Sequence, residues 1–164
     1  MNGLKLLAFC FTIITSLNCS SQKTIKIKVN ITLRPIEHYR HRLNNCKVIC
    51  YLNKIPYDST ILKKNHFKKT ISTKGLYKFE FKKDGYVSKH VLISSQNLPE
   101  KKRNKHVLEA DINLFPSSKG ENVDFLKTEP ISIGYYNETK KEMMWDFEYN
   151  RSVVEKIIHA QTKE

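Results

Sequence analysis

Two histidines and two cysteines lie close together in the sequence and are of the types that bind zinc. His38 and His41 are followed by Cys46 and Cys50, and the three residues between the cysteines are within the range of structural zinc sites. However, the segment 46–52 alternates apolar and polar residues, which puts both thiols on the core side of a strand, away from loop histidines. Nearby arginines would also repel a cation. We therefore expect core cysteines and solvated histidines, with no metal and no cofactor.

The same two cysteines are badly spaced for a disulfide. Residues four apart on one strand face the same way but lie about 13 Å apart at ~3.3 Å per residue. Bridged Cα atoms lie within ~7 Å of each other. A bridge between Cys46 and Cys50 would need a bulge or a turn between them, so the sequence predicts two buried thiols.

The sequence contains no hydrolase motif. A hydrolase needs a nucleophile beside a base, or paired carboxylates, and the chain has no Gly-x-Ser-x-Gly, His-Glu-x-x-His or Walker sequence. Asp146 and Glu148, among Trp145, Phe147 and Tyr149, could line a sugar-binding face. Alternatively, these aromatics pack a C-terminal element onto the domain. We expect a protein that is not an enzyme, with a small metal-dependent or carbohydrate-active enzyme as the alternative.

The chain is strongly basic, with a formal net charge of +13. Such a charge attracts polyanions: nucleic acids, acidic glycans or anionic lipid headgroups. If the fold brings the basic loops to one end, they form a single anion-binding surface; otherwise the lysines simply solvate the protein. The candidate anion-binding residues fall into three clusters: Arg34, Arg40 and Arg42; Lys63, Lys64, Lys68 and Lys69; and Lys101, Lys102, Arg103 and Lys105.

The N-terminal segment has the order of a secretory signal. Lys5 is followed by the uncharged, mostly apolar run 6–17 and then by small polar residues, and the run is shorter than the ~20 apolar residues that cross a bilayer. Cys19, followed by Ser-Ser-Gln, resembles the lipidation site of a bacterial lipoprotein; ordinary cleavage near Ser20 or Ser21 is the other interpretation. We expect a protein of the periplasm, outer membrane or cell surface, anchored through Cys19. Export makes nucleic acid an unlikely partner and favours an anionic envelope polymer or an envelope protein.

Strands with a two-residue period account for most of the remaining chain. Turn residues separate these alternating segments, as in a small sandwich. The segment 57–69 is ambiguous, and 131–136 could add a further strand. We predict a mostly β fold, a small antiparallel β-sandwich of transthyretin-like or immunoglobulin-like type. Its strands are expected at 24–33, 46–52, 77–81, 86–93 and 107–114.

A short C-terminal helix is predicted from about Ser152 to Ala160. Ser152 and Glu155 fit a capping box, and Val153, Val154, Ile157 and Ile158 form one apolar stripe. The expected organisation is a signal at 1–19, a β-sandwich domain at 24–115, and a C-terminal extension at 116–164 with a strand and the helix.

The segment 73–81, Thr-Lys-Gly-Leu-Tyr-Lys-Phe-Glu-Phe, followed by Gly85-Tyr86, resembles the carboxypeptidase-regulatory-like modules of the transthyretin-like β-sandwich group. In these modules a turn glycine precedes a strand of alternating aromatics, and a glycine-tyrosine pair leads to the next strand. The segments 85–89 and 129–136 are similar to exported envelope proteins of Bacteroidetes type. The resemblance covers roughly 25–114 and implies a non-catalytic structural or binding module, without functional residues to carry over.

Overall fold

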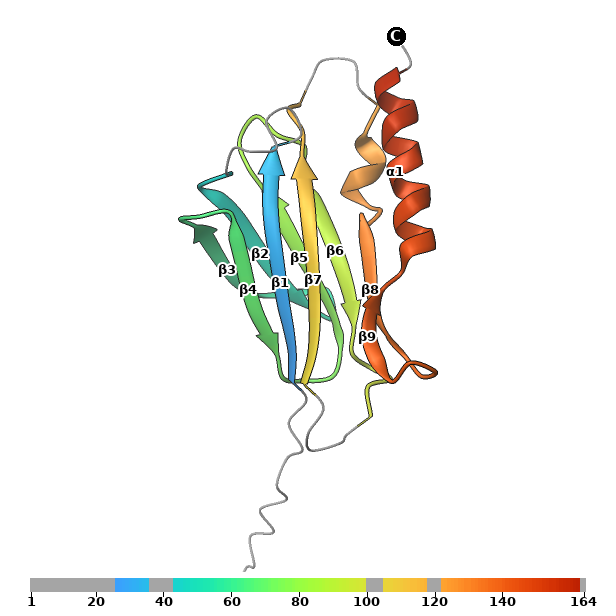
Figure 1. The fold of residues 1–164 in the computed structure, drawn as a ribbon. Helices are drawn as coiled ribbons and strands as arrows, with labels where there is room; N and C mark the ends of the chain where they lie inside the picture. Colours follow the sequence, from blue (N-terminus) through green and yellow to red (C-terminus); the bar gives the residue numbers. More distant parts are fainter. Residues whose placement is uncertain (1–25, 36–42, 100–104, 118–121, 163–164) are drawn as a thin grey trace, which may run out of the picture.

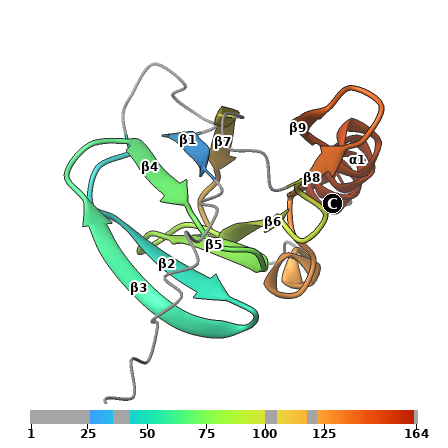
Figure 2. The same ribbon diagram turned by 90° about the horizontal axis from the view of Figure 1, so that it is seen from below.

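Two β-sheets and one C-terminal helix make up the fold of the computed structural model, which describes residues 26–35, 43–99, 105–117 and 122–162. The smaller sheet has the order β4 (His66–Ile71), β1 (Lys26–Pro35) and β7 (Lys105–Leu114). The larger sheet has the order β3 (Ile55–Leu62), β2 (Cys46–Leu52), β5 (Leu76–Lys82), β6 (Lys89–Ser94), β8 (Ser132–Asn137) and β9 (Glu142–Trp145). The sheets face each other, and the helix α1 (Phe147–Thr162) lies beside β8 (Figures 1 and 2). The predicted mostly β sandwich with a C-terminal helix is confirmed.

The core lies between the sheets and is built from the alternating residues that the sequence indicates. Side chains of β1 at every second position are buried: Ile27, Val29, Ile31 and Leu33. From β5, Tyr77, Phe79 and Phe81 point inward, and Phe67 of β4 packs against Phe79 with ring centroids 5.1 Å apart. Burying each large apolar side chain stabilises the fold by roughly 1.5–3 kcal/mol, so these facing rows hold the two sheets together.

Two strand pairs are parallel, although the other pairs are antiparallel. β1 pairs with β7 over its whole length, from Lys26 opposite Lys105 to Pro35 opposite Leu114. β6 pairs with β8, with Val91 opposite Ser132. The chain after residue 116 therefore adds β8 and β9 to the same sheet as β6, and its hydrogen bonds make it continuous with the sandwich.

Turn geometry fixes the register of the β2–β3 hairpin. Asn53 and Lys54, at its tip, both have positive φ, 50° and 71°, as a two-residue hairpin turn requires. The Asn53 side chain also accepts a hydrogen bond from the Leu76 N–H at 2.9 Å, which joins the turn to β5. Gly85 has a φ of 77°, a conformation that glycine adopts without the steric cost of a Cβ. The predicted turn at this glycine is confirmed.

The C-terminal helix begins earlier than predicted. It starts at Phe147 instead of Ser152, and Asp146 Oδ1 caps it by accepting a hydrogen bond from the Tyr149 N–H at 3.0 Å. The Ser152–Glu155 capping box is therefore wrong: Ser152 lies inside the helix and its hydroxyl donates to the Tyr149 carbonyl at 2.8 Å. Asp146 directly follows β9, so it caps the helix as the chain leaves the sheet.

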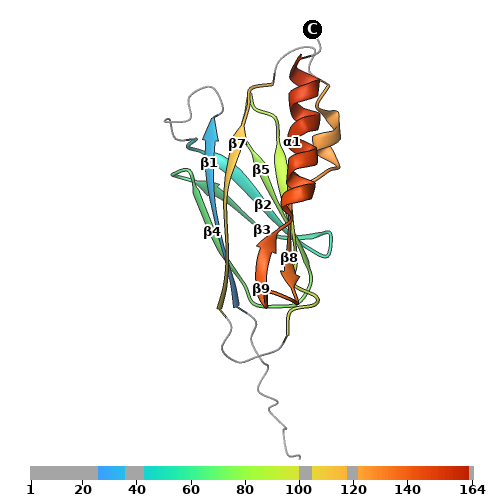
Figure 3. The same cartoon turned by 45° about the vertical axis from the view of Figure 1, so that its right-hand side comes forward.

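Only half of the predicted apolar stripe of the helix is buried. Val153 and Ile157 pack with Phe115 and Leu126 in a second, smaller core. Val154 and Ile158 are 44 % and 53 % exposed, because α1 meets the sheet along one side only (Figure 3). The short 3-10 helix η1 (Asp124–Lys127) contributes Leu126 to this smaller core.

Two further boundaries differ from the sequence prediction. The strand predicted at 86–93 starts at Lys89, and Tyr86 before it makes an isolated bridge with Pro116. The ambiguous segment 57–69 forms most of β3 and the start of β4, joined by a short turn. In the described part of the chain, no helix has both the length and the apolar character needed to cross a membrane.

Candidate anion-binding site

Described members of two of the three predicted basic clusters meet at one end of the sandwich. β1 and β4 are antiparallel, with Thr32 opposite His66, so the end of β1 lies beside the turn that leads into β4. Arg34 comes at the end of β1, and Lys63 and Lys64 form the exposed turn. We call the surface formed by Arg34, Lys63 and Lys64 the basic end.

A buried asparagine ties this turn to β1. Leu33 N–H donates to the Asn65 carbonyl at 2.8 Å, and the Asn65 side-chain amide donates back to the Leu33 carbonyl at 3.2 Å. Asn65 is only 5 % exposed. These two hydrogen bonds join the turn to β1 and so place Lys63 and Lys64 beside the end of β1.

Arg34 is partly neutralised, whereas the two turn lysines are not. A guanidinium nitrogen of Arg34 lies 3.3 Å from a carboxylate oxygen of Asp111 on β7. The two side chains are 40 % and 57 % exposed, so solvent screening keeps the contribution of this pair to stability below about 1 kcal/mol. Lys63 and Lys64 are exposed and have no ion-pair partner among the described residues. Arg40 and Arg42, of the same cluster as Arg34, lie outside the described residues.

Further lysines that the sequence analysis did not single out add to the same end. Lys47, at the start of β2, lies opposite Lys82, at the end of β5. Lys83 follows and donates to the Asn44 carbonyl at 3.0 Å. These lysines reach the basic end only because β2 pairs antiparallel with β5, and no local pattern in the sequence predicts that pairing.

The remaining predicted basic residues lie elsewhere. Lys68 is exposed on β4, opposite Asn30. Lys69 forms an ion pair with Asp58 of β3 and lies over the Tyr57 ring, 5.4 Å from its centroid, so it links the two sheets. Lys105 pairs with Lys26 at the opposite end from Arg34. Lys101, Lys102 and Arg103 lie outside the described residues, so the third cluster does not join the basic end through Lys105.

The cysteine thiols are buried and unpaired in the core. Cys46 and Cys50 are both free, as the strand spacing predicts. Burial raises the pKa of the Cys46 thiol to about 11, so it is protonated at neutral pH and a poor metal ligand. His38 and His41 lie outside the described residues, and within those residues no cluster of three metal-binding side chains occurs.

Trp145 and Asp146 have structural contacts that account for their positions. Trp145 is 9 % exposed, and its indole N–H donates to the Glu109 carbonyl of β7 at 2.8 Å, which joins the edges of the two sheets. Asp146 caps α1. Trp145 thus packs and Asp146 caps the C-terminal element, whereas Phe147 of the same aromatic group is 66 % exposed. Cys19 lies outside the described residues.

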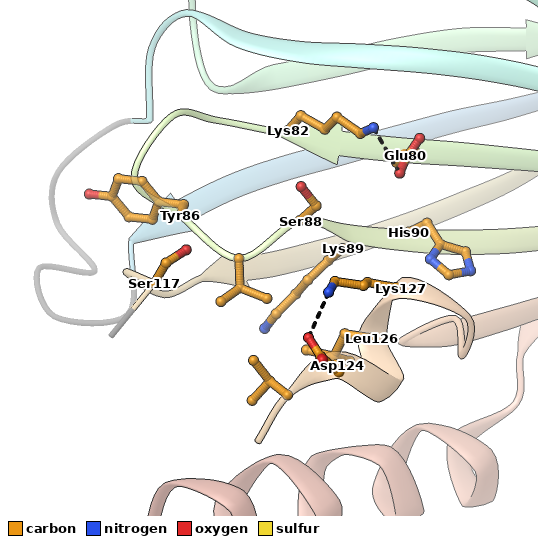
Figure 4. Close-up of a pocket in the computed structure, with 12 residues that line it drawn as sticks. Glu80, Lys82, Tyr86, Ser88, Lys89, His90, Ser117, Asp124, Leu126 and Lys127 are labelled. Carbon is orange, nitrogen blue, oxygen red and sulfur yellow. Dashed lines mark ion pairs between the residues drawn. The ribbon is translucent and has the colours of Figure 1, made fainter. Parts of the chain in front are cut away.

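A pocket of about 490 Å³ opens near the same end, on the side of β6 that η1 covers (Figure 4). Glu80, Lys82 and His90 line one wall, and Asp124 and Lys127 of η1 line another. Lys89, which also lines the pocket, is only 6 % exposed. The sequence analysis missed it, although the alternation in β6 gives a signal: Lys89 shares its register with the buried Val91 and Ile93.

Burial shifts the pKa values of Lys89 and His90 in the pocket, whereas hydrogen bonds oppose it at Glu80. Burial lowers the pKa of Lys89 from 10.5 to about 8. Burial is also the largest cause that lowers the pKa of His90, with the Lys78 ammonium adding to it. For Glu80, burial acts to raise the pKa, but hydrogen bonds from Tyr51 and Lys82 outweigh it, so the pKa lies below its ordinary value. The pocket therefore holds charged Glu80 and Lys89 at neutral pH, with His90 neutral.

No family model matches the sequence. A search of curated proteins likewise finds no match.

Proposed function

We propose that this protein is an exported, non-catalytic module of the cell envelope that binds an anionic envelope polymer at its basic end. The observation that carries the proposal is the meeting of Arg34, Lys63 and Lys64 at one end of a rigid sandwich. Rigid presentation lowers the entropy lost when a charged polymer binds, because the backbone that carries the lysines is already ordered.

The proposed lipid anchor at Cys19 precedes β1 in the sequence, and the described module begins at Lys26. β1 begins at Lys26, paired with Lys105, and its ten residues run to the basic end. At ~3.3 Å per residue its ends are about 30 Å apart. Charges that far apart are screened at physiological salt, where the Debye length is about 8 Å. The distance between the start of β1 and the basic end supports an anionic polymer, and not the headgroups next to the proposed anchor, as the partner of the basic end.

The resemblance to carboxypeptidase-regulatory-like modules is part of the same proposal. It is supported by the position of Tyr77, Phe79 and Phe81 between the two sheets. Gly75 supports it too, because a Cβ there would collide with the Leu52 side chain. Both features serve the packing of a sandwich and leave its loops available for binding.

Export and anchoring are tested by intact mass and cell fractionation of the protein from its own host. An acylated chain that begins at Cys19 and is recovered with membranes is the expected result. A chain that begins near Ser20 or Ser21 and is released with the periplasm would remove the anchor. An unprocessed N-terminal Met1 would refute export.

Polymer binding is tested by retention of the purified protein on immobilised polygalacturonate, with neutral dextran as the control. We expect retention on polygalacturonate that is lost when sodium chloride rises from about 0.05 M to about 0.5 M, because ionic contacts with a polyanion are screened by salt. Equal retention on both polymers would contradict an anionic ligand.

A further inference from the structure

Lys89 has an unusual environment for a lysine. It is 6 % exposed, and its ammonium donates to the Asn113 carbonyl at 2.6 Å and lies 4.4 Å from the centroid of the Phe115 ring. Both partners are uncharged. An ammonium has three N–H donors, and among the described residues only Asn113 accepts from it. Two donors of a buried cation therefore have no protein acceptor in the described part of the chain.

The other charged groups of the pocket are already paired with one another. Lys82 lies 3.2 Å from a carboxylate oxygen of Glu80, and Lys127 lies 2.7 Å from a carboxylate oxygen of Asp124. Both ion pairs are drawn in Figure 4. The ring of His90 is neutral at pH 7 because burial lowers its pKa. Among the described side chains that line the pocket, Lys89 thus supplies one positive charge without a counter-charge.

We propose that this pocket binds a small organic monocarboxylate, with the carboxylate accepting hydrogen bonds from the Lys89 ammonium. One carboxylate balances the single uncompensated charge. A dianionic phosphate would instead leave one negative charge unpaired beside apolar walls, which is costly.

The other lining residues suit the body of such a ligand. Val87, Val123 and Leu126 supply an apolar wall. Ser88 and Ser117 bring hydroxyl groups (Figure 4). A volume of about 490 Å³ is within the range of small-molecule sites. The pocket shares no lining residue with Arg34, Lys63 and Lys64, which carry the polymer-binding proposal. Failure of either proposal would therefore leave the other intact.

The test is isothermal titration of the purified protein with acetate, benzoate and glucuronate, and with benzamide and inorganic phosphate as comparisons. We expect at least one carboxylate to bind with a Kd on the order of 1 mM or lower, and the uncharged benzamide not to bind. The Lys89→Met variant should bind that carboxylate at least about tenfold more weakly, as expected on loss of a charge-assisted hydrogen bond. Lys140→Met removes a charge from an exposed turn outside the pocket, and it should leave the affinity within about twofold of the unchanged protein.

Chemical labelling gives a second readout that needs no variant. The carboxylate that binds should slow acetylation of Lys89 by acetic anhydride relative to Lys140, as measured by peptide mass spectrometry. The proposal is overturned if none of the three carboxylates binds, if phosphate binds more tightly than they do, or if Lys89→Met and unchanged protein bind alike. Equal acetylation of Lys89 with and without the carboxylate would overturn it independently of how the variant folds.

Discussion

Leu33 and Asn65 exchange two hydrogen bonds across the basic end: the Leu33 N–H reaches the Asn65 carbonyl at 2.8 Å, and the Asn65 amide reaches the Leu33 carbonyl at 3.2 Å. This reciprocal contact joins the end of β1 to the turn that precedes β4. It therefore determines where Lys63 and Lys64 lie relative to Arg34, and the proposed polymer-binding surface depends on it.

Replacing Asn65 with alanine should destabilise the protein and weaken polymer binding together. The substitution removes the side-chain hydrogen bond and leaves the buried Leu33 carbonyl without that donor, which costs about 1–3 kcal/mol. Urea unfolding followed by fluorescence measures the loss. Asn97→Ala, at an exposed position, is the matched control and should change stability by less than about 0.5 kcal/mol. Equal stability of the two variants would show that the Leu33–Asn65 contact does not hold the turn.

Lys89 should make stability depend on pH in a defined direction. Its pKa is about 8 in the folded protein, against 10.5 as the ordinary value, so between these pH values the unfolded chain binds more protons. The free energy of unfolding then rises as pH increases from about 8 to 10.5. Below pH 8 the charged Lys89 lowers the free energy of unfolding by about 3 kcal/mol relative to its value above pH 10.5.

The Lys89→Met variant isolates this effect. It should be more stable than the unchanged protein at pH 7 by about 1–3 kcal/mol, because an unpaired buried charge is removed. The advantage should shrink as pH rises from about 8 to 10.5, because Lys89 is then increasingly neutral in the folded protein. Cys46 and Tyr57 titrate in alkali with raised pKa values, but they do so in both proteins and cancel from the comparison. A pH-independent difference between the proteins would mean that Lys89 keeps its ordinary pKa.

The start of α1 can be tested with two neighbouring substitutions. Asp146→Ala removes the cap that accepts from Tyr149 N–H and should cost about 1 kcal/mol. Ser152→Ala removes only a hydroxyl that donates to a carbonyl within the helix, and it should be neutral or slightly stabilising. Thermal unfolding of both variants distinguishes the two positions. A larger loss for Ser152→Ala than for Asp146→Ala would support a helix that starts at Ser152.

Strand positions were predictable because one local signal dominates them. Ile27, Val29, Ile31 and Leu33 alternate with polar residues, and burying that row outweighs every competing preference. The helix start was not predictable from the same kind of signal, since Ser152 and Asp146 both have capping side chains. The helix starts after Asp146 because β9 ends at Trp145, and the end of β9 depends on its pairing with β8 in the sheet.

The candidate sites were only partly predictable for a related reason. Arg34, Lys63 and Lys64 are evident as basic residues, but their proximity follows from the antiparallel pairing of β1 and β4. The position of Lys105 at the far end follows from the parallel pairing of β1 with β7, which alternation cannot reveal. The burial of Lys89 was not predicted, because a lysine at the first position of a strand is normally expected to be exposed to solvent.

The central claim, that the basic end holds an anionic polymer, is tested most directly by comparing two charge-matched double variants. Lys63→Ser with Lys64→Ser removes two charges from the basic end. Lys26→Ser with Lys140→Ser removes two exposed charges from elsewhere in the described part of the chain. The measurement is affinity for soluble polygalacturonate at constant ionic strength. We predict at least about a tenfold loss for the first variant, at roughly 1 kcal/mol per lost ionic contact, and less than about a threefold loss for the second. Equal losses for the two variants would mean that net charge alone attracts the polymer, and would contradict a binding surface at the basic end.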